Sequence, residues 1–150
     1  MKKRKMSKEL SQIIENQRSF VKEHLEDKSK NEYETIDGKL NLLQKILDNN
    51  YYGKDKTWEL QCLGVTFGDA LSQKLGLEWV EIEDEYGIDP ALRLKNTSVI
   101  LFPLTMISKR IEADEEINVE ILFNEICKAA NEEFGFFNFF KNLIRKKQLG

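Results

Sequence analysis

The sequence predicts an α+β fold in which N-terminal and C-terminal helices pack on a small antiparallel sheet of three strands, at about 78–102. Up to Gly76, apolar residues recur every three or four positions, which is the period of an amphipathic helix. From Glu78 onward they alternate with polar residues, which is the period of a half-buried strand. Helical periodicity returns after Pro103. The 150 residues are predicted to form a single domain, 1–150, with a core of its own.

Two helices are expected in the first third of the chain. The first begins at Ser7, whose hydroxyl suits an N-cap, and it runs to about His24. The second covers 37–50. Between them, residues 27–36 are charged and have no apolar period, so they are predicted to be a linker. Residues 1–8 carry five basic side chains and no acid, and they are predicted to form a flexible basic tail.

A third helix is expected to begin near Asp55, a good capping residue, and to end at Leu75. The next residue is Gly76, the type that favours a left-handed C-cap. Inside this helix, Gly64 and Gly68 lie four residues apart and therefore on one face. No strand precedes them and no Lys-Ser or Lys-Thr follows, so they do not fit a phosphate-binding loop. They are predicted to let another element approach closely, at a cost of about 1 kcal/mol each in helix propensity.

Three short strands are expected to form an antiparallel meander after this helix. The segment 78–84 alternates apolar residues with acids, and 91–95 alternates again. The segment 98–102 is a short apolar run with β-branched residues, which is typical of a better-buried strand. Between the first two strands, 85–90 contains Tyr-Gly and Asp-Pro pairs, which favour a turn.

Helices are predicted again after the sheet. Pro103 suits the first turn of a short helix over 103–112, because proline has no amide hydrogen to leave unpaired there. An acidic loop follows, and Asn118 can cap a longer helix that ends at about Glu133. A last helix is expected at 136–148. The side chains of the Asn118 helix that are expected to point inward are Ile121, Leu122, Ile126 and Ala129.

Charge is distributed unevenly along the chain. The formal net charge is −3, but residues 141–150 are basic, as the N-terminal residues are. The segment 9–140 therefore holds fourteen basic and twenty-six acidic residues. An acidic body repels the phosphates of nucleic acid and attracts basic partners. The sequence thus argues against nucleic-acid binding and favours a basic protein partner.

Few residues offer catalytic or metal-binding chemistry. His24 is the only histidine, so a catalytic triad or a Cys-His pair would have to use it, and its polar surroundings indicate a surface position. Cys62 and Cys127 lie far apart, without the spacing of zinc ligands, and they are predicted to be buried and reduced. We therefore expect no metal, no cofactor and no catalytic residue.

The sequence favours a cytoplasmic location. No apolar run approaches the roughly 20 residues that a membrane helix needs. The basic start of the chain resembles the first region of a signal peptide, but Glu9, Gln12 and Glu15 interrupt the apolar core that would have to follow.

Acidic side chains gather in two places, the strand and turn at 81–89 and the loop at 112–116. Such carboxylates can bind a basic partner, can perform acid–base or metal chemistry, or can simply be solvated. The regular aspartate spacing of a calcium loop is absent. Our functional hypothesis is a surface that binds a basic partner. Its candidate residues are Glu81, Glu83, Asp84, Glu85, Asp114, Glu115 and Glu116.

The segment 134–150 is rich in phenylalanine, with five of the nine in the chain. On a helix it would present one apolar face bordered by basic residues. Such a helix can close the protein's own core, which we favour, or form a homodimer, and a membrane surface is the least favoured partner. The apolar face consists of Phe136, Phe137, Phe140, Leu143 and Ile144.

Several short segments in the middle of the chain carry a family resemblance. They are Leu63-Gly64, Gly68-Asp69-Ala70-Leu71, Leu77-Glu78-Trp79-Val80, Glu83-Asp84-Glu85-Tyr86-Gly87, and the run from Phe102-Pro103 to Glu112. Through them, residues 60–127 resemble the bacterial domain-of-unknown-function 3806 family. The resemblance implies a bacterial, soluble, intracellular protein and transfers no catalytic residue. It directs attention to structural roles for Gly64, Gly68, Trp79, Tyr86, Gly87 and Arg110, with Arg110 paired to Asp84 or Glu85.

Taken together, these features favour a non-enzymatic acidic module that binds another protein. Its most concrete form is an immunity-type protein, a small bacterial chain that binds and neutralises a basic toxin such as a nuclease. Charge complementarity is the reason, because a nuclease site is positive in order to hold phosphate. The alternatives are an uncharacterised housekeeping domain and an enzyme, with or without a metal, that uses the carboxylates around Glu83–Asp89.

Overall fold

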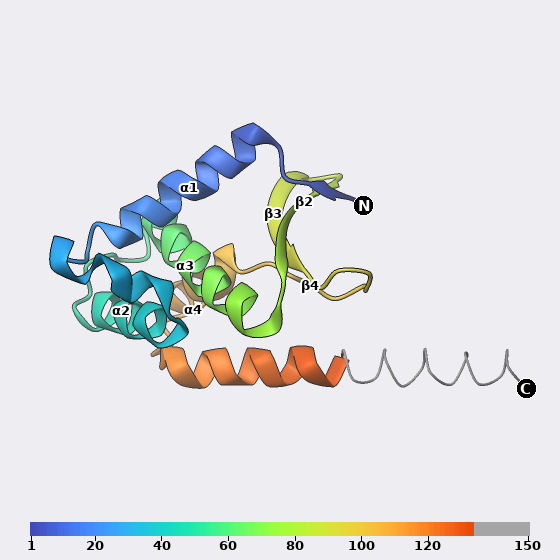
Figure 1. Ribbon diagram of the computed structural model, residues 1–150. Helices are drawn as coiled ribbons and strands as arrows, with labels where there is room; N and C mark the ends of the chain where they lie inside the picture. The colour runs from blue at the N-terminus through green and yellow to red at the C-terminus, as the bar shows by residue number, and fades with distance from the viewer. Residues whose placement is uncertain (134–150) are drawn as a thin grey trace, which may run out of the picture.

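The computed structural model describes residues 1–133, whose helices gather on one side of a four-stranded antiparallel sheet (Figure 1). The α+β class is confirmed, and the sheet has one strand more than the three predicted. Its spatial order is β1-β2-β3-β4, so each strand pairs with its neighbours in the sequence. The strands are β1 Lys2–Lys5, β2 Glu78–Asp84, β3 Gly87–Arg93 and β4 Ile100–Leu101.

The additional strand, β1, forms from residues predicted to be a flexible tail. Lys2–Lys5 pairs antiparallel with β2, and the register sets Lys2 opposite Glu83 and Arg4 opposite Glu81. Opposite charges that face each other across two strands stabilise the pairing. All four residues of β1 are exposed, and lysines on an edge strand discourage further strand addition. The basic residues at the start of the chain are thus part of the sheet.

Strand β3 begins four residues earlier than predicted. β2 and β3 form a hairpin that closes at Asp84 and Gly87, and Gly87 has a φ of 127°, which favours glycine. Pro90 therefore lies within the strand rather than in a turn. Its missing amide hydrogen is tolerated because β4 pairs only with Leu92 and Arg93, so the other edge of β3 is free at Pro90.

The helices follow the predicted order, with ends that differ by a few residues. The predicted linker folds into a short 3₁₀ helix, η1, and its Tyr33 is buried. A further helix spans residues 119–133. The elements are α1 Lys8–Lys22, η1 Asp27–Glu34, α2 Ile36–Asp48, α3 Thr57–Leu75 and α4 Leu104–Glu112.

Three of the predicted helix caps are confirmed. The amide of Leu10 donates to Ser7 Oγ at 3.2 Å, and the amide of Ile121 donates to Asn118 Oδ1 at 3.0 Å. Gly76 ends α3 in the left-handed conformation, with φ at 68°. The predicted cap at Asp55 is wrong, because the N-cap position of α3 is Lys56, which makes no side-chain capping bond.

Helix 119–133 turns a different face inward from the one predicted. Ile121 is 55% exposed and Ala129 is also exposed, whereas Leu122 is buried as expected. The buried residues instead begin at Val119, the first residue of the helix, and lie along the face that points toward the core. They are Val119, Leu122, Phe123, Cys127 and Ala130. The predicted apolar face at 136–144 lies outside the described residues.

Helix α3 is the centre of the core and contacts α1, α2 and α4. Its two glycines, Gly64 and Gly68, lie where the start of α4 and the ring of Trp79 come close to the helix. A Cβ added to Gly64 would stand 2.5 Å from the carbonyl oxygen of Leu104, in α4. A Cβ added to Gly68 would stand 2.8 Å from Pro103 Cγ and from the ring of Trp79. The glycines therefore bring the start of α4 and the sheet against the central helix.

We expect Gly64→Ala to lower the free energy of unfolding by about 2 kcal/mol, because the methyl group meets backbone atoms of α4 that cannot turn aside. The gain in helix propensity, about 1 kcal/mol, is too small to offset this. Urea unfolding followed by circular dichroism measures the change. Lys74→Ala, on the exposed side of the same helix, is the matched control and should change stability by less than about 0.5 kcal/mol. Equal stability of Gly64→Ala and the wild type would contradict this packing argument.

Candidate functional site

The carboxylate of Asp69, on α3, accepts hydrogen bonds from three other elements. Arg18 of α1 donates from Nε to Oδ2 at 2.6 Å and from Nη2 to Oδ1 at 2.9 Å. Tyr33 of η1 donates its hydroxyl at 2.7 Å, and Trp79 of β2 donates its ring nitrogen at 3.0 Å. The side chain of Asp69 is only 12% exposed, so these donors replace most of its water.

The electrostatics of this cluster favour a structural role. Hydrogen bonding to Asp69 raises the pKa of Arg18, and burial followed by the charge of Asp69 raises the pKa of Tyr33 well above its usual range. Lys39 lies over the ring of Tyr33 at 5.1 Å, and burial lowers its pKa. Both oxygens of Asp69 are engaged by these donors. The cluster therefore holds α1, η1, α3 and β2 together.

Glu81 was predicted to belong to an exposed binding surface, and the structure corrects this. Its side chain is 4% exposed, and it accepts from Arg4 Nε at 2.5 Å and from the amide of Ser7 at 2.8 Å. The bond from Arg4, followed by that from Ser7, lowers the pKa of Glu81. Arg4 also donates to Glu83 at 2.8 Å. The first acidic cluster is thus neutralised in part by the protein's own β1.

The other residues of the strand and turn lie at the end of the hairpin. Asp84 and Glu85 are exposed, and Asp84 accepts from the amide of Tyr86 at 2.8 Å. Tyr86 is 87% exposed. Arg110 donates to the carbonyl oxygen of Met106 at 2.8 Å, and within residues 1–133 it forms no ion pair with Asp84 or Glu85. The predicted pairing across the sheet is therefore not formed.

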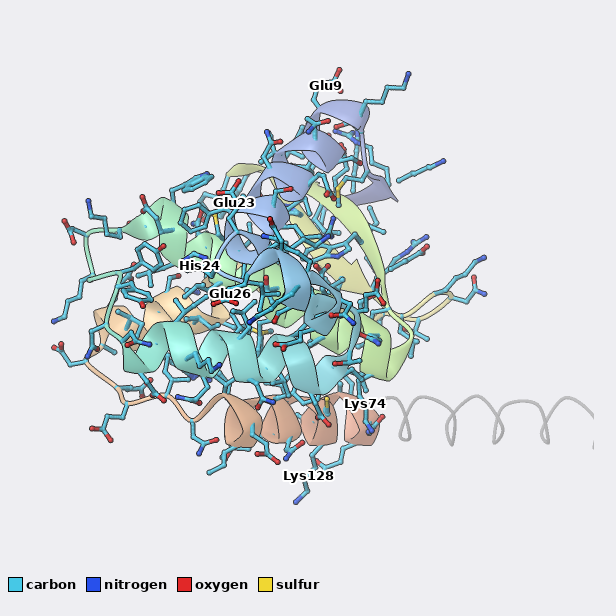
Figure 2. The ribbon with its side chains drawn as sticks, turned by 60° about the vertical axis from the view of Figure 1, so that its left-hand side comes forward. Glu9, Glu23, His24, Glu26, Lys74 and Lys128 are labelled. Atoms are coloured by element: carbon cyan, nitrogen blue, oxygen red, sulfur yellow. The ribbon has the colours of Figure 1, made fainter. Side chains whose placement is uncertain are left out.

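The second acidic cluster is larger than predicted. Over residues 112–133 the chain carries eight acids and one base, Lys128. Helix 119–133 runs beside α2, and Lys128 points outward from it (Figure 2). We call this surface, together with Asp37 and Asp48 of α2, the acidic face. Its exposed residues from 112 onward are Glu112, Asp114, Glu115, Glu116, Glu120, Glu125, Glu132 and Glu133.

Gln44 of α2 holds the acidic face in place. Its Nε2 donates to the carbonyl oxygen of Ile117 at 3.1 Å, and its Oε1 accepts from the amide of Val119 at 2.8 Å. These two bonds fix the start of helix 119–133 against α2. The same Nε2 also donates to Asp48 at 2.9 Å. Gln44 thus holds Asp48 of α2 and the start of helix 119–133 close to each other.

Two grooves run along the acidic face. One, of about 590 Å³, is lined by Asp37, Asp48 and Glu120, among others. The second, of about 380 Å³, is lined by Asp48, Glu115 and Glu116. Glu115, Glu116 and Glu120 form no ion pair with any other residue of the described chain. These grooves can receive cationic side chains.

Other chemistry is scarce in the part of the chain that the structure describes. His24 is half-buried, accepts from Tyr52 at Nε2 at 2.7 Å, and has backbone carbonyl oxygens within 3.2 Å of Nδ1, so both ring nitrogens are engaged. Cys62 and Cys127 are free and buried, and burial raises the pKa of Cys62 to about 12. No three metal-binding side chains among residues 1–133 lie together. No helix of these residues has the length and apolar character to cross a membrane.

Asp69 was not predicted from the sequence to be a key residue. It occurs inside the segment Gly68-Asp69-Ala70-Leu71, which carried the family resemblance, and it is the one charged residue on the buried middle of α3. A lone acid among apolar helical neighbours was the signal, because a buried carboxylate requires donors. Its three donors, Arg18, Tyr33 and Trp79, have no such mark in the sequence.

Comparisons with known proteins agree on the family and the fold. A family described as a domain of unknown function, DUF3806, matches residues 39–123. No curated protein matches the chain. A crystal structure from Bacteroides thetaiotaomicron VPI-5482 is similar, with a TM-score of 0.64 and 14% sequence identity. The similarity covers 81% of this chain and 45% of that one, so this chain spans less than half of its length. At this identity the likeness concerns the fold alone.

We expect Asp69→Asn to lower the free energy of unfolding by about 3 kcal/mol, because an amide cannot accept all the bonds and Arg18 loses the less exposed of its two carboxylate partners, keeping only Glu15. Thermal and urea unfolding measure the loss. Asp89→Asn is the control, since Asp89 is exposed and forms no ion pair within residues 1–133; it should cost less than about 0.5 kcal/mol. If both variants were equally stable, Asp69 would not hold the fold together.

The bond between Arg4 and Glu81 should make stability depend on pH. The pKa of Glu81 is lower in the folded state than its ordinary value of 4.5, so its stabilising contribution is present above about pH 4.5 and is lost as pH falls below it. The wild type should therefore be more stable than Glu81→Gln near neutral pH, and the difference should shrink on acidification. Urea unfolding over a pH series measures it. Glu85→Gln, at an exposed position, should show little difference at any pH, and a Glu81→Gln difference that grew in acid would refute the argument.

Proposed function

The chain belongs to the domain-of-unknown-function 3806 family, and we propose that it works as a non-enzymatic module that binds a basic protein. The observation that carries the proposal is the acidic face, in which exposed carboxylates from α2 and from residues 112–133 lie along shared grooves. The strand and turn at 81–85 contribute less, because Arg4 binds both Glu81 and Glu83.

The physical basis is long-range attraction followed by local pairing. Carboxylates of one sign on a face produce a field that steers a cationic partner toward it and raises the association rate. Glu115, Glu116 and Glu120 are exposed and keep their charges free of internal partners in the described chain. Asp114 already pairs with Lys54 at 2.5 Å, so it contributes less to a partner. Because exposed charges are screened, binding through this face should weaken as salt rises.

The more specific form of the proposal is an immunity-type protein that acts in the cytoplasm. A toxin that cleaves nucleic acid needs a positive site, and a rigid carboxylate-rich groove can occupy such a site. The bond network of Gln44 supports rigidity, since it fixes both walls of the groove before a partner arrives. A housekeeping role with a different basic partner uses the same surface, and the identity of the partner distinguishes the two.

We expect a basic protein to be retained from native cell lysate at low salt, and the purified pair to bind through the acidic face. The test variant reverses three charges, Glu115→Lys, Glu116→Lys and Glu120→Lys. Isothermal titration with the purified partner should show affinity at least about tenfold weaker, and wild-type affinity should fall between about 50 and about 300 mM salt.

The matched control reverses three exposed acids on and after α1, Glu9, Glu23 and Glu26, none of which belongs to the acidic face or lines its grooves; Figure 2 labels them. It changes the net charge by the same amount, so it should lower the affinity far less than the test variant does. Asp84→Lys with Glu85→Lys tests the hairpin turn in the same way. Equal weakening by all three variants would mean that the acidic face is no specific site. The absence of any basic partner at either salt concentration would refute the proposed function.

A further inference from the structure

Another hollow lies on the side of the molecule where α1 crosses α3, away from the acidic face. It has a volume of about 550 Å³ and is lined by residues of α1, α3, β3, α4 and the segment before α4. Figure 1 places α1 at the top of the view and helix 119–133 at the bottom, so the two surfaces are separate. We call this hollow the α1–α3 groove.

The walls of the α1–α3 groove are largely apolar and partly open to water. Ile13 is 51% exposed, Trp58 is 48% exposed and Phe102 is 43% exposed, and all three line it. Leu10, Ile14 and Pro90 add further apolar surface. Single exposed apolar side chains are ordinary, but several gathered in one hollow are typical of binding sites. The volume also falls within the usual range of small-molecule sites, about 300–1,000 Å³.

The groove also contains a buried polar atom with no partner. Gln17 is 3% exposed and lines the groove, and its Oε1 has no hydrogen-bond partner among residues 1–133. Buried amide oxygens in folded proteins nearly always accept a hydrogen bond, because leaving one unpaired is costly. Gln17 Oε1 is the one buried side-chain atom of the described chain in this condition. It therefore points to an N–H or O–H donor that residues 1–133 do not supply.

We infer that the α1–α3 groove binds a small aromatic molecule that carries an N–H or O–H group, with this group donating to Gln17 Oε1. The aromatic part fits the walls, since Trp58 and Phe102 offer ring surfaces for edge or offset packing. A few polar groups among apolar walls commonly fix the orientation of a ligand. The inference concerns this groove alone and is independent of the acidic face.

Two probes that differ only in the substituent on the ring nitrogen, a hydrogen or a methyl group, test the inference on the full chain. Indole has an N–H donor, and N-methylindole has the same ring without it. Titration followed by amide NMR should show saturable shifts around Ile13, Trp58 and Phe102 with indole, and affinity for N-methylindole should be at least about fivefold weaker, the effect of one hydrogen bond. No saturable shifts at these residues, or equal affinity for the two probes, would overturn the inference.

Two variants test whether the preference for indole depends on Gln17 Oε1. Gln17→Leu replaces the amide with an apolar side chain that has no acceptor oxygen, so the variant should no longer prefer indole to N-methylindole. Gln61→Leu changes another glutamine that lines the groove and should keep the preference for indole. If Gln17→Leu retained the preference, Gln17 would not be the acceptor and the inference would fail. Should Gln17→Leu not fold, Trp58→Ala replaces it: weaker binding of both probes supports the groove as the site, and unchanged binding overturns it.

Discussion

The architecture depends on the need of one nearly buried carboxylate, Asp69, for hydrogen-bond donors. A charged group in the middle of α3 is stable only if other elements surround it with polar hydrogens. Arg18, Tyr33 and Trp79 supply them, and each comes from a different element. Non-directional apolar packing alone would allow α1, η1 and β2 to settle against α3 in several ways. The hydrogen bonds of Asp69 are directional, so they select one arrangement and position the surfaces on either side of the core.

The family resemblance acquires a physical meaning from this arrangement. Asp69 accepts a bond from Trp79, and the ring of the same tryptophan packs against Gly68. Gly64, four residues before Gly68 in α3, lets α4 approach the same helix closely. Four of the five segments that carried the resemblance therefore meet at one junction between α3, β2 and the start of α4, whereas 83–87 lies at the exposed end of the hairpin. These four segments maintain the fold, whereas the acidic face lies largely on other residues.

Local patterns were sufficient for much of the fold, and long-range contacts decided the rest. Ser7, Gly76 and the alternation of β2 are local signals, and each predicted its element. β1 has no apolar alternation that would predict a strand. Its pairing depends on Glu81 and Glu83, which lie far along the chain. The density of acids around 81–85 was equally misleading, since the burial of Glu81 follows from Arg4. The acidic face combines α2 with residues 112–133, and only the folded chain brings these segments together.

The pairing of β1 with β2 has a consequence for the order in which the chain folds during synthesis. Arg4 and Glu81 are separated by 77 positions, so the N-terminal strand leaves the ribosome long before its partner exists. The hairpin of β2 and β3 is local and can form as soon as both strands have emerged. β1 must then find the finished hairpin edge across a large loop, which makes its addition a late event in assembly. The start of the chain is thus among the last parts of the sheet to be secured, and its positive charge stays available to other molecules until then.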